Sequence, residues 1–265
     1  MEKAVSADGT TIAYDREGDG PLVVIVGGAF NDRNTWSELA TALAGQGFTA
    51  LSYDRRGRGE SGDTQPYAVE REIEDLTAVI AAAGSGEGPV FVHAVSSGAG
   101  LVFRAMAGGL ALTRLSVLEP PYRVEGAPPA PSHYIATLQG YVDRDDRDGL
   151  VEYFQTQVVG LPAGMVESFR STPMWASLCA MAPTLVYDGH VLGGDDHSFP
   201  DDLLASVRVP VLAVTSSGTA PAWLSRTAEK VASAVPEGEW VRLDGGFHFV
   251  PPPVLAPALA AFYRG

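Results

Sequence analysis

The sequence has a single cysteine, Cys179, which excludes an internal disulfide and a cysteine-rich metal site. Basic residues are also scarce, since 18 Lys and Arg stand against 32 Asp and Glu, for a formal net charge of −14. No basic cluster exceeds the segment D-R-R-G-R at residues 54–58. This balance argues against nucleic acid, or an anionic membrane surface, as a partner bound through a basic patch.

Long apolar runs are missing as well. None approaches the roughly 20 residues of a membrane-spanning helix, and the first ten residues, M-E-K-A-V-S-A-D-G-T, lack the apolar core of a signal peptide. We therefore expect a soluble, cytoplasmic protein. The composition, 46% hydrophobic and 19% charged, is ordinary for a globular enzyme. A chain of 265 residues is long enough for one domain with a large core and an insertion.

Apolar runs typical of strands alternate with segments of helical pattern along most of the chain. This alternation predicts βαβ units and a mostly parallel, doubly wound sheet with helices on both faces. After an opening hairpin over residues 3–16, the predicted strands are 22–26, 48–53, 90–92, 115–118, 209–215 and 240–243. The predicted helices between and after them end near residue 44, cover 69–83, follow the strand at 90–92, and close the chain at 254–263.

The pattern changes between residues 121 and 202, where no strong strand occurs and helical periodicity appears at 134–142 and 150–159. We predict that residues 1–120 and 203–265 form an α/β core and that 121–202 form a mostly helical cap. The cap is rich in methionine and aromatic residues, which favours a medium-sized apolar substrate. The same side chains are equally typical of packing against the sheet.

The segment V-F-V-H-A-V-S-S-G-A-G at residues 90–100 carries the main catalytic signal. A strand, a sharp turn of small residues and a helix form the context of a nucleophile elbow. The turn requires small residues two positions before and after the nucleophile. Ser96 meets this requirement with Ala94 and Gly98, whereas Ser97 would place the β-branched Val95 there. We predict Ser96 as the nucleophile; the alternative is a plain strand-to-helix turn.

A serine nucleophile needs a base to take its proton. His248 lies in the loop L-D-G-G-F-H-F-V-P after the last predicted strand, and we predict it as that base. His93 lies on the strand before Ser96, where a role in the core or behind the catalytic residues is expected. The other three histidines fall in the predicted cap: His133, His190 and His197.

The acid that orients the histidine is harder to place. Its common position, the loop after the strand at 209–215, reads S-S-G-T-A-P-A-W and has no carboxylate. Glu119 follows the strand at 115–118, at the carboxyl end where open α/β sheets keep their sites, and we predict it as the acid. A salt bridge to a cap arginine is the structural alternative for Glu119. Other candidate acids are Asp244, near His248, and three cap residues, Asp188, Asp195 and Asp196.

The oxyanion of an acyl-transfer reaction needs backbone N–H donors. We predict those of Ser97, directly after the nucleophile, and Ala29, in the G-G-A-F turn after the strand at 22–26. The glycines of that turn allow close approach of the backbone to a substrate. Phe30 is expected to line the substrate pocket, whereas core packing is favoured over that role for Trp36. Three cap residues complete the predicted pocket: Met174, Trp175 and Tyr187.

Four motifs in this order resemble those of the α/β-hydrolase fold superfamily, and the resemblance covers essentially the whole chain. G-G-A-F-N-D-R-N-T-W is similar to the oxyanion segment H-G-x, with Gly27 in place of histidine. Y-D-R-R-G-R-G-E-S-G resembles the D-x-R-G-x-G-x-S turn, which implies structural roles for Asp54 and Arg56. A-V-S-S-G is similar to the elbow, with Ala94 in place of glycine, and G-G-F-H to the histidine loop. A minority of the superfamily takes its acid from the position of Glu119.

Together these features indicate a capped serine esterase that needs neither metal nor cofactor. Ser96 would attack the ester or thioester carbonyl of a small to medium apolar molecule, His248 would relay the proton, and Glu119 would hold His248. The expected partner is therefore a small-molecule substrate, not a nucleic acid or a membrane. Two other classes remain open: a non-hydrolytic catalyst on the same scaffold, such as a lyase, cyclase or tailoring enzyme, and a catalytically silent ligand receptor.

Overall fold

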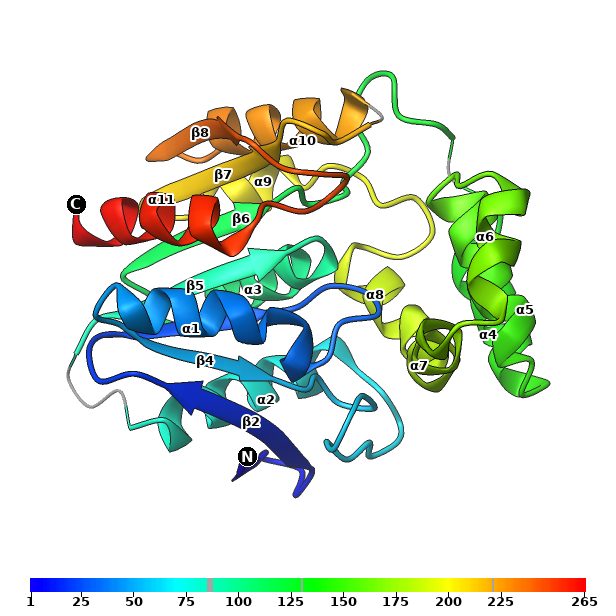
Figure 1. The fold of residues 1–265 in the computed structure, drawn as a ribbon, viewed down its shortest axis with the longest axis horizontal. Helices are drawn as coiled ribbons and strands as arrows, with labels where there is room; N and C mark the ends of the chain where they lie inside the picture. The colour runs from blue at the N-terminus through cyan, green and yellow to red at the C-terminus, as the bar shows by residue number, and fades with distance from the viewer. Residues whose placement is uncertain (85–87, 130, 221) are drawn as a thin grey trace.

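Eight strands form one mostly parallel sheet in the computed structural model, which describes residues 1–84, 88–129, 131–220 and 222–265 (Figure 1). The spatial order is β1 (Glu2–Val5), β2 (Thr11–Glu17), β4 (Thr49–Tyr53), β3 (Leu22–Val26), β5 (Val90–Val95), β6 (Arg114–Leu118), β7 (Val211–Ser216) and β8 (Gly238–Leu243). β1 and β2 pair antiparallel, β2 runs antiparallel to β4, and the remaining neighbours are parallel. This confirms the predicted α/β fold.

The central strands are apolar on both faces because helices cover both faces (Figure 1). In β3, Val23 and Ile25 face the cluster formed with α1 (Ser37–Gly45) and α11 (Pro252–Arg264). Val24 and its alternate neighbours face the opposite cluster. The helices that contribute to this second cluster are α2 (Val69–Ala82), α3 (Ser97–Ala107), α9 (Asp201–Ala205) and α10 (Ala222–Ala234).

One predicted strand begins two residues early. β7 starts at Val211 rather than at residue 209. Pro210 has no N–H to donate to a ladder, although its carbonyl still accepts from Leu115 N at 3.1 Å. The pairing with both neighbouring strands therefore becomes regular only after the proline.

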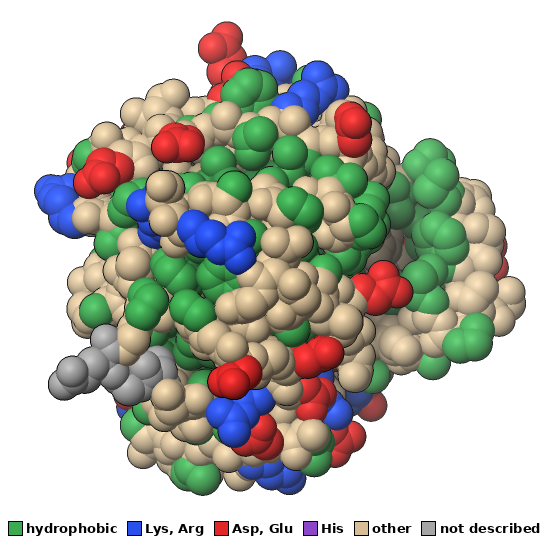
Figure 2. All heavy atoms as spheres, turned by 60° about the vertical axis from the view of Figure 1, so that its left-hand side comes forward, with side chains coloured by type: hydrophobic (Ala, Val, Ile, Leu, Met, Phe, Trp, Pro, Cys, Tyr) green, Lys and Arg blue, Asp and Glu red, His purple; other side chains and the backbone are tan. Residues whose placement is uncertain are grey.

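Between β6 and β7 the described residues form helices and no named strand. We use "the insertion" for the segment from α4 to α8, which projects beyond one edge of the sheet in Figure 1 and stands out as a lobe beside a hollow in Figure 2. It has its own apolar cluster, which includes Leu138, Val166 and Leu185. Its helices are α4 (Tyr134–Asp143), α5 (Arg147–Tyr153), α6 (Ala163–Arg170), α7 (Pro173–Met181) and α8 (Leu185–Val191), with short turns at Phe154–Val158 and Ala182–Thr184. The domain limits at residues 121 and 202 stay a prediction.

The last helix of the insertion, α8, returns to the core. A Cβ on Gly100 of α3 would lie 2.8 Å from the Val191 carbonyl, so only glycine allows the two helices to approach this closely. A Cβ on Gly189 would likewise meet Ile135 of α4 at 2.5 Å. α8 therefore packs between α4 of the insertion and α3, the helix that begins directly after Ser96. Across the described ranges, no helix is both long and apolar enough to cross a membrane.

Candidate active site

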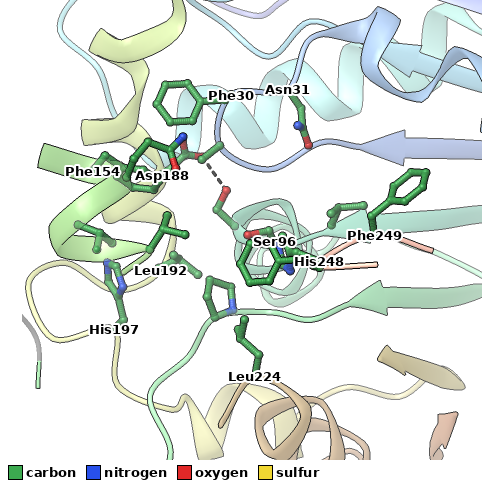
Figure 3. A pocket seen from close by; sticks show the side chains of 18 of the residues that line it. Phe30, Asn31, Ser96, Phe154, Asp188, Leu192, His197, Leu224, His248 and Phe249 are labelled. Atoms are coloured by element: carbon green, nitrogen blue, oxygen red, sulfur yellow. Dashed lines mark hydrogen bonds between the residues drawn. The ribbon is translucent and has the colours of Figure 1, made fainter. Parts of the chain in front are cut away.

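Three residues far apart in the sequence meet at the carboxyl edge of the sheet. Ser96 directly follows β5, Glu119 directly follows β6, and His248 lies in the loop after β8. Backbone hydrogen bonds tie the first two positions to neighbouring strands: Ser96 N donates to Leu118 O at 2.9 Å, and Glu119 N donates to Val214 O at 3.2 Å. Ser96 and His248 line the same cavity (Figure 3).

Ser96 has the backbone of a nucleophile elbow. Its φ of 55° and ψ of −124° are unfavourable for a residue with a side chain, and α3 begins at the next residue. The structure also gives the reason for a small residue at position 98. A Cβ on Gly98 would lie 2.5 Å from the Val26 carbonyl and 2.8 Å from that of Gly27. The requirement for a small residue at position 98 therefore comes from the backbone at the end of β3. The sequence argument considered only the sizes of Ala94 and Gly98 and does not reveal this neighbour.

Glu119 is in direct contact with His248, with Oε2 2.7 Å from Nδ1. The carboxylate is fully buried and accepts two further hydrogen bonds, from Ser216 N at 2.8 Å and Thr219 Oγ1 at 3.0 Å. Thr219 Oγ1 also accepts from His248 N at 2.9 Å. Because an ionised carboxylate only accepts hydrogen bonds, this contact places the proton of a neutral imidazole on Nδ1 and leaves Nε2 free as a base.

The other candidate acids have other surroundings, although Asp188 also lines the cavity. Asp188 is buried against Arg55 and Arg58, Asp195 accepts from Ile135 N, and Asp196 accepts from Ser198 N. Asp244 is exposed. Within the described ranges, Glu119 is the carboxylate that touches His248, and it makes no salt bridge to an arginine of the insertion.

The cavity beside Ser96 has a volume of about 370 Å³ and a mainly apolar lining (Figure 3). Phe30 and Phe154 meet edge to face, with ring centroids 5.4 Å apart. Trp36 takes both of the roles considered for it, since it belongs to the core cluster and also reaches the cavity. Further apolar lining comes from Ala29, Leu192, Leu224 and Phe249.

The three cap residues predicted for the pocket have other surroundings, outside the described lining of the cavity. Trp175 is buried in the insertion, where its Nε1 donates to Asp148 at 2.6 Å. Tyr187 stacks on Tyr67 with centroids 3.8 Å apart, and its hydroxyl bonds Asp63 at 2.8 Å. Met174 is 48% exposed. These side chains build or coat the insertion instead of facing Ser96.

The two residues predicted to donate to the oxyanion lie beside Ser96. Ala29 and Ser97 both line the cavity. Gly28 lies against Ser96, because a Cβ on Gly28 would be 2.7 Å from Ser96 Cβ. In the described part of the chain, neither the Ala29 nor the Ser97 N–H has a hydrogen-bond acceptor in the protein. Both donors are therefore available to a ligand.

The residues with expected structural roles are buried in polar contacts. Asp54 accepts from Arg33 N at 2.7 Å and from Glu60 N at 2.9 Å, and Arg56 pairs with Asp75 at 2.7 Å. His93 is fully buried with Nδ1 2.8 Å from Ser116 Oγ, and burial lowers its pKa to about 3. No described group of His, Cys, Asp or Glu has the arrangement of a metal site.

Backbone strain marks the site more clearly than any sequence motif. Seven non-glycine residues in the described ranges have positive φ, and five of them belong to the catalytic loops or the cavity lining. Strain of this kind persists where the surroundings impose it, and it clusters at functional sites. The sequence pattern placed His197 only in the cap and gave no sign of its position at the cavity. The five residues are Phe30, Ser96, Glu119, His197 and His248.

Comparisons with known proteins identify the family and the fold. Residues 23–261 match the model of the alpha/beta hydrolase family. The structure resembles that of an alpha/beta hydrolase from Sphaerobacter thermophilus, with 45% identity, a TM-score of 0.91, and coverage of 99% of this chain and 100% of the other. An esterase from Rhodococcus sp. ECU1013 shares the fold at 19% identity and a TM-score of 0.73, with 100% and 98% covered.

Curated relatives match over a shorter segment. An uncharacterised hydrolase of Bacillus subtilis is 32% identical over 94 residues, 34% of each chain. A proline iminopeptidase of Pestalotiopsis fici is 32% identical over 101 residues, 37% of this chain and 36% of its own. The match thus spans about a third of the length of these relatives.

Proposed function

Because the chain belongs to the alpha/beta hydrolase family, we propose that it is a serine hydrolase that cleaves an ester or thioester of a small to medium apolar molecule. The observation that carries this proposal is the buried contact between Glu119 and His248 at the cavity that Ser96 lines. A carboxylate, an imidazole and a strained serine at one edge of a sheet form the arrangement that activates a serine.

In the proposed reaction, Ser96 Oγ attacks the carbonyl carbon while His248 Nε2 takes the hydroxyl proton. The tetrahedral oxyanion accepts hydrogen bonds from the N–H groups of Ala29 and Ser97. The bond to the alcohol or thiol breaks, His248 protonates the leaving group, and an acyl-Ser96 ester remains. Water, deprotonated by His248, then releases the acid and restores Ser96. Glu119 stabilises the imidazolium that forms in each half.

The bond between nucleophile and base has to form during this cycle. Among the described residues, Ser96 Oγ has no hydrogen-bond partner. Catalytic hydrogen bonds are often long without substrate and close when it binds. The preference for esters over peptides rests on the cavity, whose mainly apolar lining suits an acyl or alkyl group and offers few partners for a peptide backbone.

A fluorophosphonate probe tests the proposal, with the modified peptide mapped by mass spectrometry in the wild type and in Glu119→Gln. We expect labelling at Ser96 and a much lower labelling rate in the variant. Unchanged labelling of the variant would remove Glu119 from the triad. An unlabelled wild type that also fails to hydrolyse activated esters would overturn the serine-hydrolase proposal and favour a non-hydrolytic enzyme or a receptor.

A further inference from the structure

A buried cluster of four charged residues lies behind the oxyanion turn. Arg58 donates to both oxygens of Asp188, at 2.9 and 2.8 Å, and Arg55 donates to Asp188 at 2.8 Å. Arg55 also forms a two-point pair with Glu72, at 2.7 and 2.9 Å. All four side chains are at most 3% exposed, and their charges balance. Burial alone raises the pKa of Asp188, but Arg58 and Arg55 outweigh it and hold that pKa below its usual value.

This cluster contacts the first oxyanion donor through the backbone. Arg58 uses Nη2 for Asp188, and its other terminal nitrogen, Nη1, donates to the Gly28 carbonyl. In a trans peptide the C=O and the following N–H point in opposite directions, and the Gly28–Ala29 bond is trans. Since Arg58 holds the Gly28 carbonyl, the Ala29 N–H points away from Arg58, and Ala29 itself lines the cavity.

The same cluster contacts the residue that carries the second donor. Ser97 Oγ donates to Asp188 Oδ1 at 2.7 Å, the contact drawn as a dashed line in Figure 3. Asp188 comes from α8 of the insertion, whereas Ser97 begins α3 of the core. One carboxylate therefore connects both halves of the oxyanion hole, to Ser97 directly and to Ala29 through Arg58.

We propose that Asp188 and Arg58 are positioning residues that set the oxyanion hole, and that docking of α8 is what brings Asp188 to it. This inference rests on the proposed serine-hydrolase function. It predicts that loss of the Asp188 charge weakens stabilisation of the transition state more than binding of the substrate, because neither residue acts on the ester itself.

The test compares Asp188→Asn with Asp75→Asn, a matched control that alters an equally buried arginine pair away from the oxyanion turn. With 4-nitrophenyl butyrate, we expect Asp188→Asn to lower kcat roughly 10-fold to 100-fold with KM within about threefold. Binding of a trifluoromethyl ketone, which forms a tetrahedral adduct, should weaken by a similar factor. Asp75→Asn should keep kcat within about twofold at a comparable loss of Tm. Ser97→Ala, which removes only the hydroxyl contact, should show a smaller loss in the same direction.

Equal kcat in the two aspartate variants, or losses that follow Tm alike in both, would overturn the positioning role. Unchanged ketone affinity in Asp188→Asn would do the same. A wild type that neither hydrolyses the ester nor binds the ketone would refute the proposed function itself, and the inference with it.

A second observation concerns the polar part of the cavity lining. His197 Nε2 and Arg123 Nε are buried without a hydrogen-bond partner in the described protein, and both residues line the cavity. His197 is only 7% exposed, and Figure 3 shows it beyond Leu192 as seen from Ser96. Arg123 N donates to His197 O at 2.9 Å, which holds the two residues side by side. Buried polar atoms without partners require an explanation.

The chemistry of these groups points to an acceptor. Arg123 carries a positive charge, and its guanidinium donates to the Pro128 carbonyl but forms no salt bridge in the described ranges. Burial lowers the pKa of His197 to about 4, so its ring is neutral at pH 7 and offers one N–H. We infer that the otherwise apolar substrate carries one carboxylate remote from the scissile ester, and that Arg123 binds this carboxylate with His197 alongside. This too rests on the proposed function.

Two esters that share a leaving group test this subsite: 4-nitrophenyl butyrate and the mono-4-nitrophenyl ester of glutaric acid. We expect the wild type to favour the acidic ester in kcat/KM, and Arg123→Met to lose at least roughly tenfold on it while keeping the neutral ester within about twofold. Arg144→Met, which removes an arginine of the insertion outside the cavity lining, is the matched control. No preference in the wild type, or equal losses on both esters in Arg123→Met, would overturn the subsite. Turnover of the neutral ester separates this failure from that of the proposed function.

Discussion

Two groups of loops at the carboxyl ends of the strands differ in how completely their polar side chains are hydrogen-bonded. The loop after β4, residues 54–58, has every charged side chain in buried hydrogen bonds, as with Arg56 and Asp75. In the loops after β5 and β8, Ser96 Oγ is unpartnered among the described residues, and Ser96 and His248 both have strained backbones. Position at the carboxyl edge is therefore not enough to identify a catalytic group. The groups available for chemistry are those whose partners are incomplete.

The largest effect that this comparison predicts is for Ser96→Ala. Esterase activity should fall by roughly 10⁴-fold or more, because the nucleophile is lost, while Tm stays close to that of the wild type. Ser52→Ala is the control: Ser52 is a buried serine of β4 whose hydroxyl donates to Arg33 O at 2.8 Å. It should lose about 1 kcal/mol of stability and keep its activity. Steady-state kinetics and thermal melts on both variants decide whether the two serines differ as stated.

Glu119→Gln comes next. The amide can still occupy the buried site. Because it no longer requires a donor at His248 Nδ1 and carries no charge to stabilise the imidazolium, kcat/KM should fall by roughly 10³-fold to 10⁴-fold. Stopped-flow or steady-state hydrolysis of an activated ester measures the loss. A decrease below about tenfold would contradict a catalytic role for the contact between Glu119 and His248.

For the loop after β4 we expect the reverse: breaking one of its ion pairs should lower stability strongly and change kcat little. Asp75→Ala leaves Arg56 buried with a lost partner, and we expect it to lower the free energy of unfolding by about 3–5 kcal/mol. Urea denaturation measures the loss, and kcat of the folded fraction should stay within about twofold. The double variant Arg56→Met, Asp75→Leu should recover most of the stability, since it removes both charges. If the double variant is as unstable as the single one, the ion pair itself is not what the single variant disrupts.

The last prediction concerns stability alone and the buried histidine His93. The pKa of His93 is about 3 when folded, below the 6.5 of an unperturbed histidine, so the unfolded chain binds the extra proton. Stability should therefore rise with pH between about 3 and 6.5 and be lost progressively as pH falls through that window. His93→Asn, which can still contact Ser116, should flatten the dependence of the unfolding free energy on pH over this range. An unchanged slope would show that His93 is not the group that titrates.

Sequence reasoning could propose catalytic residues where their near neighbours in the chain carry the signal. Ser96 follows from the size of its near neighbours, and Glu119 from the absence of a carboxylate in the loop after β7 together with its place at a strand end. The sequence did not predict the contacts that residues of the insertion make. The apolar character of Trp175 and Met174 fits a pocket as well as packing or the surface, and only the path of the chain separates these roles.

Sequence reasoning missed the long-range polar contacts for the same reason. Asp188 was a candidate for the acid because it is a carboxylate in the insertion, yet it lies 91 residues from its partner Ser97. Thr219, which bonds both Glu119 and His248, occurs in a stretch read only as lacking an acid. Strand patterns carry information about neighbours two or four residues apart, and a hydrogen bond across the fold leaves no such period.

The position of Thr219 has a consequence for how such a site changes over evolutionary time. Thr219 lies in the loop after β7, the common position of the acid in the superfamily. Its hydroxyl bonds both Glu119, the acid proposed here, and the backbone N–H of His248. A lineage could gain a carboxylate at 219 before losing the one at 119, so that each intermediate sequence keeps a functioning acid. The triad would then move from one strand end to the next without an inactive ancestor.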